Sequence, residues 1–112
     1  MTIMKLVTAA LLLGTAASAS AQASYEGAGE TSELDCDGGT ATITGASNTM
    51  TVTGGCKQLI IEGAGNRVQV DLAPKGIIRI TGAGNRVTWR TPDATKAQVQ
   101  IVGAGNRVTH AR

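Results

Sequence analysis

The sequence predicts an all-β protein, a small parallel β-helix or solenoid of four to five coils with about 18–21 residues per coil. One hexapeptide, Gly-Ala-Gly-Asn-Arg-Val, occurs at Gly63–Val68, Gly82–Val87 and Gly103–Val108. Short segments in which apolar residues alternate with polar ones flank each copy, which is a strand pattern. The chain has no Phe and few other aromatic residues, so stacked Val, Ile, Leu and Ala must form its core, as they do in solenoids.

Residues 1–23 are expected to be a signal peptide. Lys5 supplies a positive charge, Leu6–Leu13 an apolar stretch, and small residues offer cleavage near Ala21 or Ala23. The apolar stretch is too short to span a bilayer, so we expect no transmembrane segment in the mature chain. We therefore expect a periplasmic or secreted protein in which residues 24–112 form one β-solenoid repeat domain.

Two looser copies of the motif, Gly27–Ser32 and Gly45–Met50, precede the identical ones, so that repeats start at residues 27, 45, 63, 82 and 103. A near-fixed period of this size indicates that each repeat is one coil. When the coils are aligned, similar residues fall above one another. The expected inward rows are Ala41, Leu59, Ile78 and Val99; Ile43, Ile61, Ile80 and Ile101; Met50, Val68, Val87 and Val108; and Leu34, Val52, Val70, Trp89 and His110.

The motif itself is expected to form the corner between the two strands of each coil, because glycine reaches positive φ at little cost. Small side chains are expected to fill this tight corner, namely Ala46, Ala64, Ala83 and Ala104. An asparagine amide both donates and accepts, so it can bond the backbone groups that a bend leaves unpaired in its own and the next coil. The residues of this expected structural ladder are Asn48, Asn66, Asn85 and Asn106.

Cys36 and Cys56 are the only cysteines and lie about one coil apart. In an exported chain an even pair is expected to form a disulfide. Adjacent coils lie about 4.8 Å apart, within the Cα separation that a disulfide requires. The bridge would join the first coil to the second.

The stretches Ala73–Gly76 and Thr91–Ala94 each contain a proline and are expected to be turns that connect coils. They account for the drift of the period from 18 to 21 residues. Insertions in a solenoid collect on one side, which is often the side where partners bind.

Arg67, Arg86 and Arg107 each follow a ladder asparagine and are expected to point outward as a column with steps of about 4.8 Å. One hypothesis is that the column binds a polyanion such as an acidic polysaccharide or lipopolysaccharide, since arginine matches carboxylate and phosphate geometry. The alternative is a solvated, solubilising face. Nucleic acid is not expected, because the aromatic residues that stack on bases are missing.

Self-assembly is a hypothesis of another class. Acidic residues dominate from Glu26 to Asp71 and basic residues from Leu72 onward, so a stack of coils would be an electric dipole along its axis. The final coil, residues 99–112, presents free strand edges, which pair with other chains unless they are blocked. Head-to-tail contacts between copies would then make a scaffold.

No enzyme, cofactor or metal site is predicted. The Gly-x-Gly-x-x-Val pattern lacks the third glycine and the following helix of a dinucleotide fingerprint. Calcium would need carboxylates at the corners, where Asn and Arg stand instead. His110, the only histidine, has no recurring Ser, Cys or carboxylate to work with, so no catalytic residue is assigned.

The repeated Gly-Ala-Gly-Asn-x-Val with flanking alternation, over residues 45–110, resembles the domain-of-unknown-function family numbered 3060 of exported bacterial proteins. The resemblance implies a small β-solenoid in the envelope or outside the cell. It implies no activity, cofactor or catalytic residue. Our expectation is therefore a non-enzymatic envelope or secreted protein with a binding or scaffold role.

Overall fold

The computed structural model describes residues 22–93 and 95–111. Within these residues all regular structure is β-strand, and no helix long and apolar enough to cross a membrane is present. The strands are β1 (Gln22–Ala28), β2 (Thr31–Asp35), β3 (Thr40–Ala46), β4 (Thr49–Ala64), β5 (Arg67–Ala83), β6 (Arg86–Arg90), β7 (Gln98–Ala104) and β8 (Arg107–His110). The all-β prediction is confirmed.

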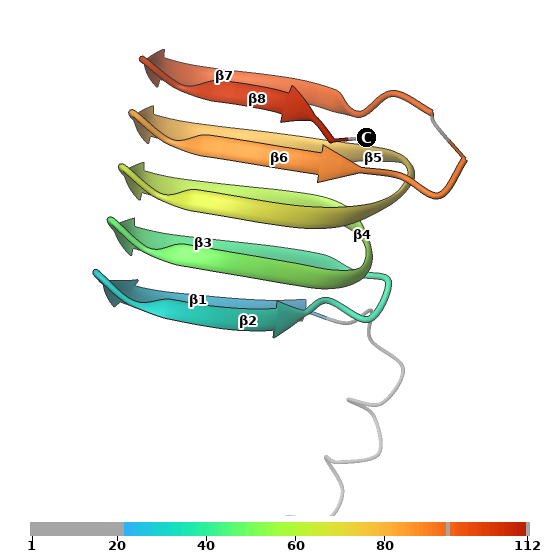
Figure 1. Ribbon diagram of the computed structural model, residues 1–112, viewed down its shortest axis with the longest axis horizontal. Coiled ribbons are helices and arrows are strands. Elements are labelled where there is room, and N and C mark those ends of the chain that lie inside the picture. Colours follow the sequence, from blue (N-terminus) through green and yellow to red (C-terminus); the bar gives the residue numbers. More distant parts are fainter. Residues whose placement is uncertain (1–21, 94, 112) are drawn as a thin grey trace, which may run out of the picture.

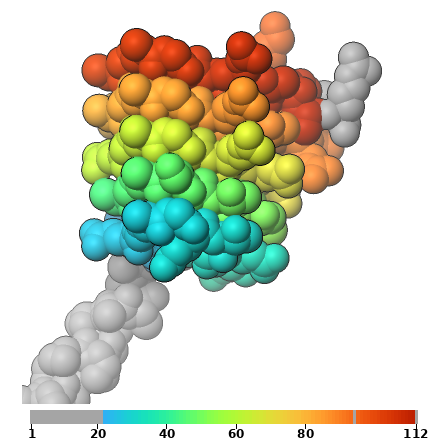
Figure 2. Space-filling model, turned by 60° about the vertical axis from the view of Figure 1, so that its left-hand side comes forward, coloured from blue at the N-terminus to red at the C-terminus, as the bar shows by residue number. Residues whose placement is uncertain are grey.

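The strands form a flattened solenoid of five coils with two parallel ladders (Figure 1). The back ladder contains β1, β3, the second halves of β4 and β5, and β7. The front ladder contains β2, the first halves of β4 and β5, β6 and β8. In each coil the chain runs along the back, turns at the Gly-Asn corner and returns along the front, which makes a right-handed coil. Figure 2 brings the corner side forward and shows the coils as successive layers from blue to red.

The register between coils places like residues over like, as the alignment of repeats predicts. Ile43 pairs with Ile61 and Ile61 with Ile80, and on the front ladder Val68 pairs with Val87. The inward side chains of the middle coils are buried, with Leu59 at 0% exposure and all others at 7% or less. The narrow interior is therefore filled mainly by aliphatic residues, together with Met50, the two cysteines and, in the fourth coil, Trp89.

The prediction that alanines fill the corner is wrong. Ala46, Ala64, Ala83 and Ala104 are all exposed. The asparagine two residues further on lies inside the corner instead, and Asn48, Asn66 and Asn85 are 0% exposed. The chain reverses direction here, so only one residue of the bend itself points inward, and the polar backbone groups of the bend favour a side chain that can bond them.

The turn predicted at Ala73–Gly76 lies within β5, which continues around the second corner of its coil. Its residues occupy a gap in the pairing with β4, between Leu72 and Ile77. Pro74 cannot donate a ladder hydrogen bond and is tolerated in such an irregularity. The second predicted turn is present around Pro92 and Asp93, and its last residue, Ala94, lies outside the described residues.

The two end coils differ from the middle ones. β1 begins at Gln22, two residues before the expected start of the domain, and Ala23 lies in register beneath Ala41. The rest of the expected signal peptide, residues 1–21, lies outside the described residues. At the other end Val99 and Ile101 belong to inward rows and yet are 39% and 42% exposed, because no described coil lies above them.

Candidate functional site

The corners contain a continuous ladder of asparagine side chains. Asn66 Oδ1 accepts hydrogen bonds from the backbone N–H and from Nδ2 of Asn48, at 3.0 and 3.1 Å. Asn66 Nδ2 donates to Asn85 Oδ1 in the next coil and to the Gly45 carbonyl in the preceding one, both at 3.0 Å. The same pattern repeats at Asn85. These side chains are fully bonded inside the molecule, so the ladder holds coils together and offers nothing to a ligand.

Glycine is required beside this ladder because the coils approach too closely for a side chain. At Gly63, where φ is 143°, a Cβ atom would lie 1.8 Å from the carbonyl oxygen of Gly45. At Gly82 the corresponding distance to Gly63 is 1.7 Å. This carbonyl is the one to which the asparagine Nδ2 donates, so the glycine ladder and the asparagine ladder fit each other.

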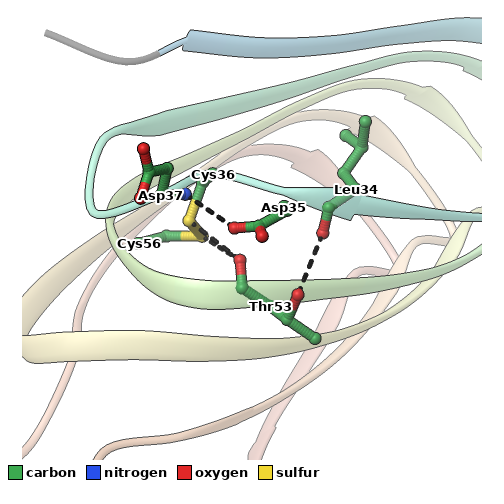
Figure 3. The surroundings of a disulfide bond; sticks show 6 residues. All are labelled: Leu34, Asp35, Cys36, Asp37, Thr53 and Cys56. Atoms are coloured by element: carbon green, nitrogen blue, oxygen red, sulfur yellow. Dashed lines mark hydrogen bonds between the residues drawn. A yellow bond between two sulfur atoms is a disulfide. The ribbon is translucent and has the colours of Figure 1, made fainter.

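Cys36 and Cys56 form the predicted disulfide, with their Cα atoms 5.5 Å apart (Figure 3). Both residues are 0% exposed, and the carbonyl of Thr53 lies 3.2 Å from Cys36 Sγ. Asp35 Oδ1 accepts from the Asp37 N–H at 2.9 Å and shapes the turn after β2. The disulfide therefore anchors the first coil to the second at the corner opposite the asparagines.

The three repeat arginines are brought together on the front ladder. Arg67 pairs in register with Arg86, and Arg86 with Arg107. All three are exposed, and in the part of the chain that the structure describes none of them takes part in an ion pair. Neighbouring strands lie about 4.8 Å apart, so the guanidinium groups form one close column of positive charge.

A row of uncharged polar side chains runs beside the arginine column. It contains Thr51, Gln69, Thr88 and Thr109 in register. A hollow of about 370 Å³ lies between this row and the column, lined among others by Arg67 and Arg86. We call the column, this row and the hollow the arginine face. It presents cationic groups and hydroxyl and amide groups at the same regular spacing.

The sequence analysis missed the third outward row of the front ladder, where Asp71 pairs with Arg90. Arg90 Nε lies 3.2 Å from Asp71 Oδ1, and both side chains are largely exposed, so this ion pair contributes at most about 1 kcal/mol. The pair borders a second hollow of about 580 Å³, between the connections that contain Pro74 and Pro92. The two residues stand four positions after Arg67 and Arg86, so alignment of the coils by register would have found them.

One more connection is shaped by a carboxylate. Asp93 Oδ1 accepts hydrogen bonds from the hydroxyl and the backbone N–H of Thr95, at 2.8 and 3.2 Å. These bonds, led by that to the hydroxyl, lower the pKa of Asp93 below its ordinary value. They fix the loop beside the second hollow and leave Asp93 without the raised pKa that general acids need.

The ring of His110 stacks on Trp89, with centroids 4.0 Å apart, and covers the end of the core. Residues 22–93 and 95–111 contain no group of His, Cys, Asp and Glu that could hold a metal ion. The groups of the arginine face are suited to binding anions.

The fold and the ladder of asparagine side chains at its corners together define the class of protein. It is a parallel β-solenoid built from glycine and asparagine repeats. Residues 43–97 match the family described as "Protein of unknown function (DUF3060)", so this segment is similar to the family that the repeated motif resembles. The matched segment contains the corners at Gly45, Gly63 and Gly82 and therefore the middle of the solenoid. The comparisons with curated proteins and with solved structures found no match.

Proposed function

We propose that this protein is an exported binding protein that holds an acidic glycan on its arginine face. The observation that carries the proposal is the column of Arg67, Arg86 and Arg107, exposed, in register and without ion pairs among the described residues. Like charges about 4.8 Å apart repel one another, and a bound polyanion would relieve this repulsion.

The chemistry of the face favours a polymer that carries carboxylate or phosphate groups. A guanidinium group forms two parallel hydrogen bonds to either group. The neighbouring Thr and Gln side chains donate and accept hydrogen bonds, which suits sugar hydroxyl groups. Acidic polysaccharides and lipopolysaccharide share this combination of anionic groups and hydroxyls, so both are candidate ligands.

The uneven distribution of charge along the front ladder supports a defined position for the glycan. The first coil contributes Glu33 and Asp35 to the outward rows, whereas the last three coils contribute the arginine column. An anionic polymer is therefore repelled at the first coil and attracted at the later ones. Single-stranded nucleic acid remains a poor candidate, since Trp89 is buried and no aromatic residue stands in the outward rows.

The test is retention on immobilised alginate, which carries carboxylates, and on immobilised lipopolysaccharide, which carries phosphates, along a salt gradient. The variant R67Q/R86Q/R107Q removes the column. A matched control, K57Q/K75Q/R79Q, removes three positive charges that lie off the front face. We expect wild type and control to elute together and the column variant to elute at clearly lower salt, because ionic contacts weaken as salt screens them.

Circular dichroism must first show that all three proteins are folded alike. Co-elution of the column variant with wild type on both matrices would refute the proposal. Early elution of the control together with the column variant would do the same, since retention would then follow net charge. Retention on only one matrix would identify the anionic group.

A further inference from the structure

We infer that copies of this chain stack end to end, with the last coil (β7 and β8) of one copy on the first coil (β1 and β2) of the next, so that sheet and asparagine ladder continue across the junction. The contact surface is the end of the solenoid. It is separate from the arginine face, so the inference does not rest on glycan binding.

The C-terminal end of the described chain has the character of an interior surface. Ile101 and Val99 are 42% and 39% exposed, whereas Ile80 and Ile78 beneath them are 1% and 0% exposed. No described residue pairs with the outer edges of β7 and β8. Strand edges of this kind pair with other strands unless charge, proline or a covering segment prevents it.

The ladder at this end offers hydrogen-bond donors without acceptors. In each inner coil the asparagine N–H and Nδ2 both donate to the Oδ1 of the next coil, as Asn85 does to Asn106 at 3.0 Å. Asn106 Nδ2 donates only downward, to the Gly82 carbonyl at 3.0 Å. Among the described residues its backbone N–H and second Nδ2 hydrogen have no partner. The pattern of the inner coils places an acceptor for these donors one coil further on.

The first coil presents an acceptor at the matching position. Glu30 takes the place of asparagine in this corner, and its N–H donates to Asn48 Oδ1 at 3.2 Å, as an asparagine N–H would. The Glu30 carboxylate is exposed. Its Oε1 accepts the hydroxyl of Tyr25, which raises the pKa of that phenol, and Oε2 has no partner among the described residues. Its oxygens can accept from the Asn106 donors of another copy, whereas an asparagine here would also donate to the glycine carbonyl of the preceding coil, as Asn106 does to Gly82.

The side chains of Tyr25 and Glu30 also lie where a preceding coil would lie if the stack continued below β1 and β2. A Cβ atom on Gly45 would collide with the carbonyl of Gly27 in the coil beneath. On Gly27 itself a Cβ atom would meet the Tyr25 hydroxyl and Glu30 Oε1 instead, at 2.6 and 3.1 Å. Side chains therefore fill the position that a preceding coil fills elsewhere, and they can move aside because they are the mobile ends of long residues.

Charge favours the same arrangement of copies. The first coil carries only acidic residues in its described part, Glu26, Glu30, Glu33, Asp35 and Asp37. The described part of the last coil carries only basic ones, Lys96 and Arg107. Opposite ends attract and like ends repel, so stacking is head to tail and open-ended. If the register between coils continues across the junction, Ile101 lies on Tyr25 and Gly103 on Gly27.

The experiment uses sedimentation velocity on the protein purified after export, over a range of concentrations. Ile101→Glu places a charge in the junction at the C-terminal end. Gln100→Glu, its matched control, places the same charge on the neighbouring outward residue. Glu30→Lys blocks the N-terminal end by setting a donor against the donors of Asn106. Ile101 and Glu30 are already exposed, so all variants should fold, which circular dichroism checks.

We expect wild type and Gln100→Glu to form larger species as concentration rises, and each blocked variant alone to stay monomeric. Mixing Ile101→Glu with Glu30→Lys leaves one intact end on each protein and should give a one-to-one dimer. A wild type that is monomeric at every concentration would overturn the inference. So would dimers of Glu30→Lys alone, which would show that two C-terminal ends meet.

Discussion

Each corner asparagine below the last coil connects three consecutive coils through one side chain. Asn66 bonds Asn48 and Gly45 in the coil below and Asn85 in the coil above. A residue with only donors or only acceptors could not do this, because the amide oxygen faces one neighbour and the amide nitrogen faces both. The identity of the residue at this position follows from the hydrogen bonding of the bend.

Asn66→Ala should destabilise the protein by at least about 2 kcal/mol, because it leaves the Asn48 amide groups and the Gly45 carbonyl buried without partners. Asn106→Ala is the matched control, since Asn106 is partly exposed and water can replace its bonds. Urea unfolding monitored by circular dichroism measures both changes. Equal losses of stability would contradict a ladder that depends on burial.

Substitutions at two glycines of one corner separate the cost of steric crowding from the cost of a left-handed backbone conformation. Gly84→Ala places a Cβ at ordinary contact distance, 3.9 Å from the Gly65 nitrogen, at a φ of 69°, which costs about 1–2 kcal/mol for the left-handed conformation alone. Gly82→Ala adds a collision with the Gly63 carbonyl, so the coils must separate and the loss should be several-fold larger. Thermal unfolding of the two variants measures the difference. Similar melting temperatures would mean that the corner can relax.

At the scale of the element, the first coil is the one that depends on a covalent bond. Its inward residues Tyr25 and Leu34 are only partly buried, because packing reaches them from one side. The disulfide joins this coil to β4, where the chain is continuous around the second corner. A weakly packed end coil is thereby attached to a well-packed middle.

Replacement of Cys36 and Cys56 by Ala should lower the free energy of unfolding by about 3 kcal/mol, as expected for a loop closed over 20 residues of sequence separation. Hydrogen exchange should accelerate chiefly in β1 and β2, because each coil of a solenoid contacts only its neighbours. Uniform acceleration through β4 and β5 would show instead that the coils open as one unit. Reduction of the wild type is the parallel control.

At the scale of the whole molecule, the coils form a stack with an acidic first coil and a basic last coil. The front ladder adds a second asymmetry, since the arginine column occupies only the later coils. The two ends of the stack are thus available for assembly, and the arginine face is available for a ligand. The two proposals therefore use different surfaces of the same molecule.

Cleavage of the expected signal peptide gives a prediction at the scale of the whole molecule. β1 begins at Gln22, and Ala23 lies beneath Ala41 in the inward row. Cleavage after Ala21 leaves β1 intact, whereas cleavage after Ala23 removes two strand residues and uncovers Ala41. We therefore expect Gln22 as the first residue of the mature chain in the export that we propose, which N-terminal sequencing or mass spectrometry measures. A chain that starts at Ser24 would contradict this prediction.

The sequence alone determined the alternating segments on either side of each corner, the inward rows, and the glycine and asparagine positions of the corners. The reason is that every coil pairs with a near copy of itself, so a repeat in sequence is a repeat in space. The alternation around Ile61 and Val68 gives the faces, and the Gly-Asn pairs give the bends. The disulfide followed as well, because two cysteines about one coil apart become neighbours in any such stack.

The tertiary structure decided what breaks the repeat. It placed the corner alanines outside, since the path of the bend rather than residue size selects which side chain points inward. It brought Asp71 to Arg90 and set Pro74 in a gap of the ladder, because the second corner varies in length from coil to coil. It also revealed the unmatched donors of Asn106 and the acceptor of Glu30. The repeats predict the free strand edges of the last coil, but they do not show which donors and acceptors of the corners lack a partner there.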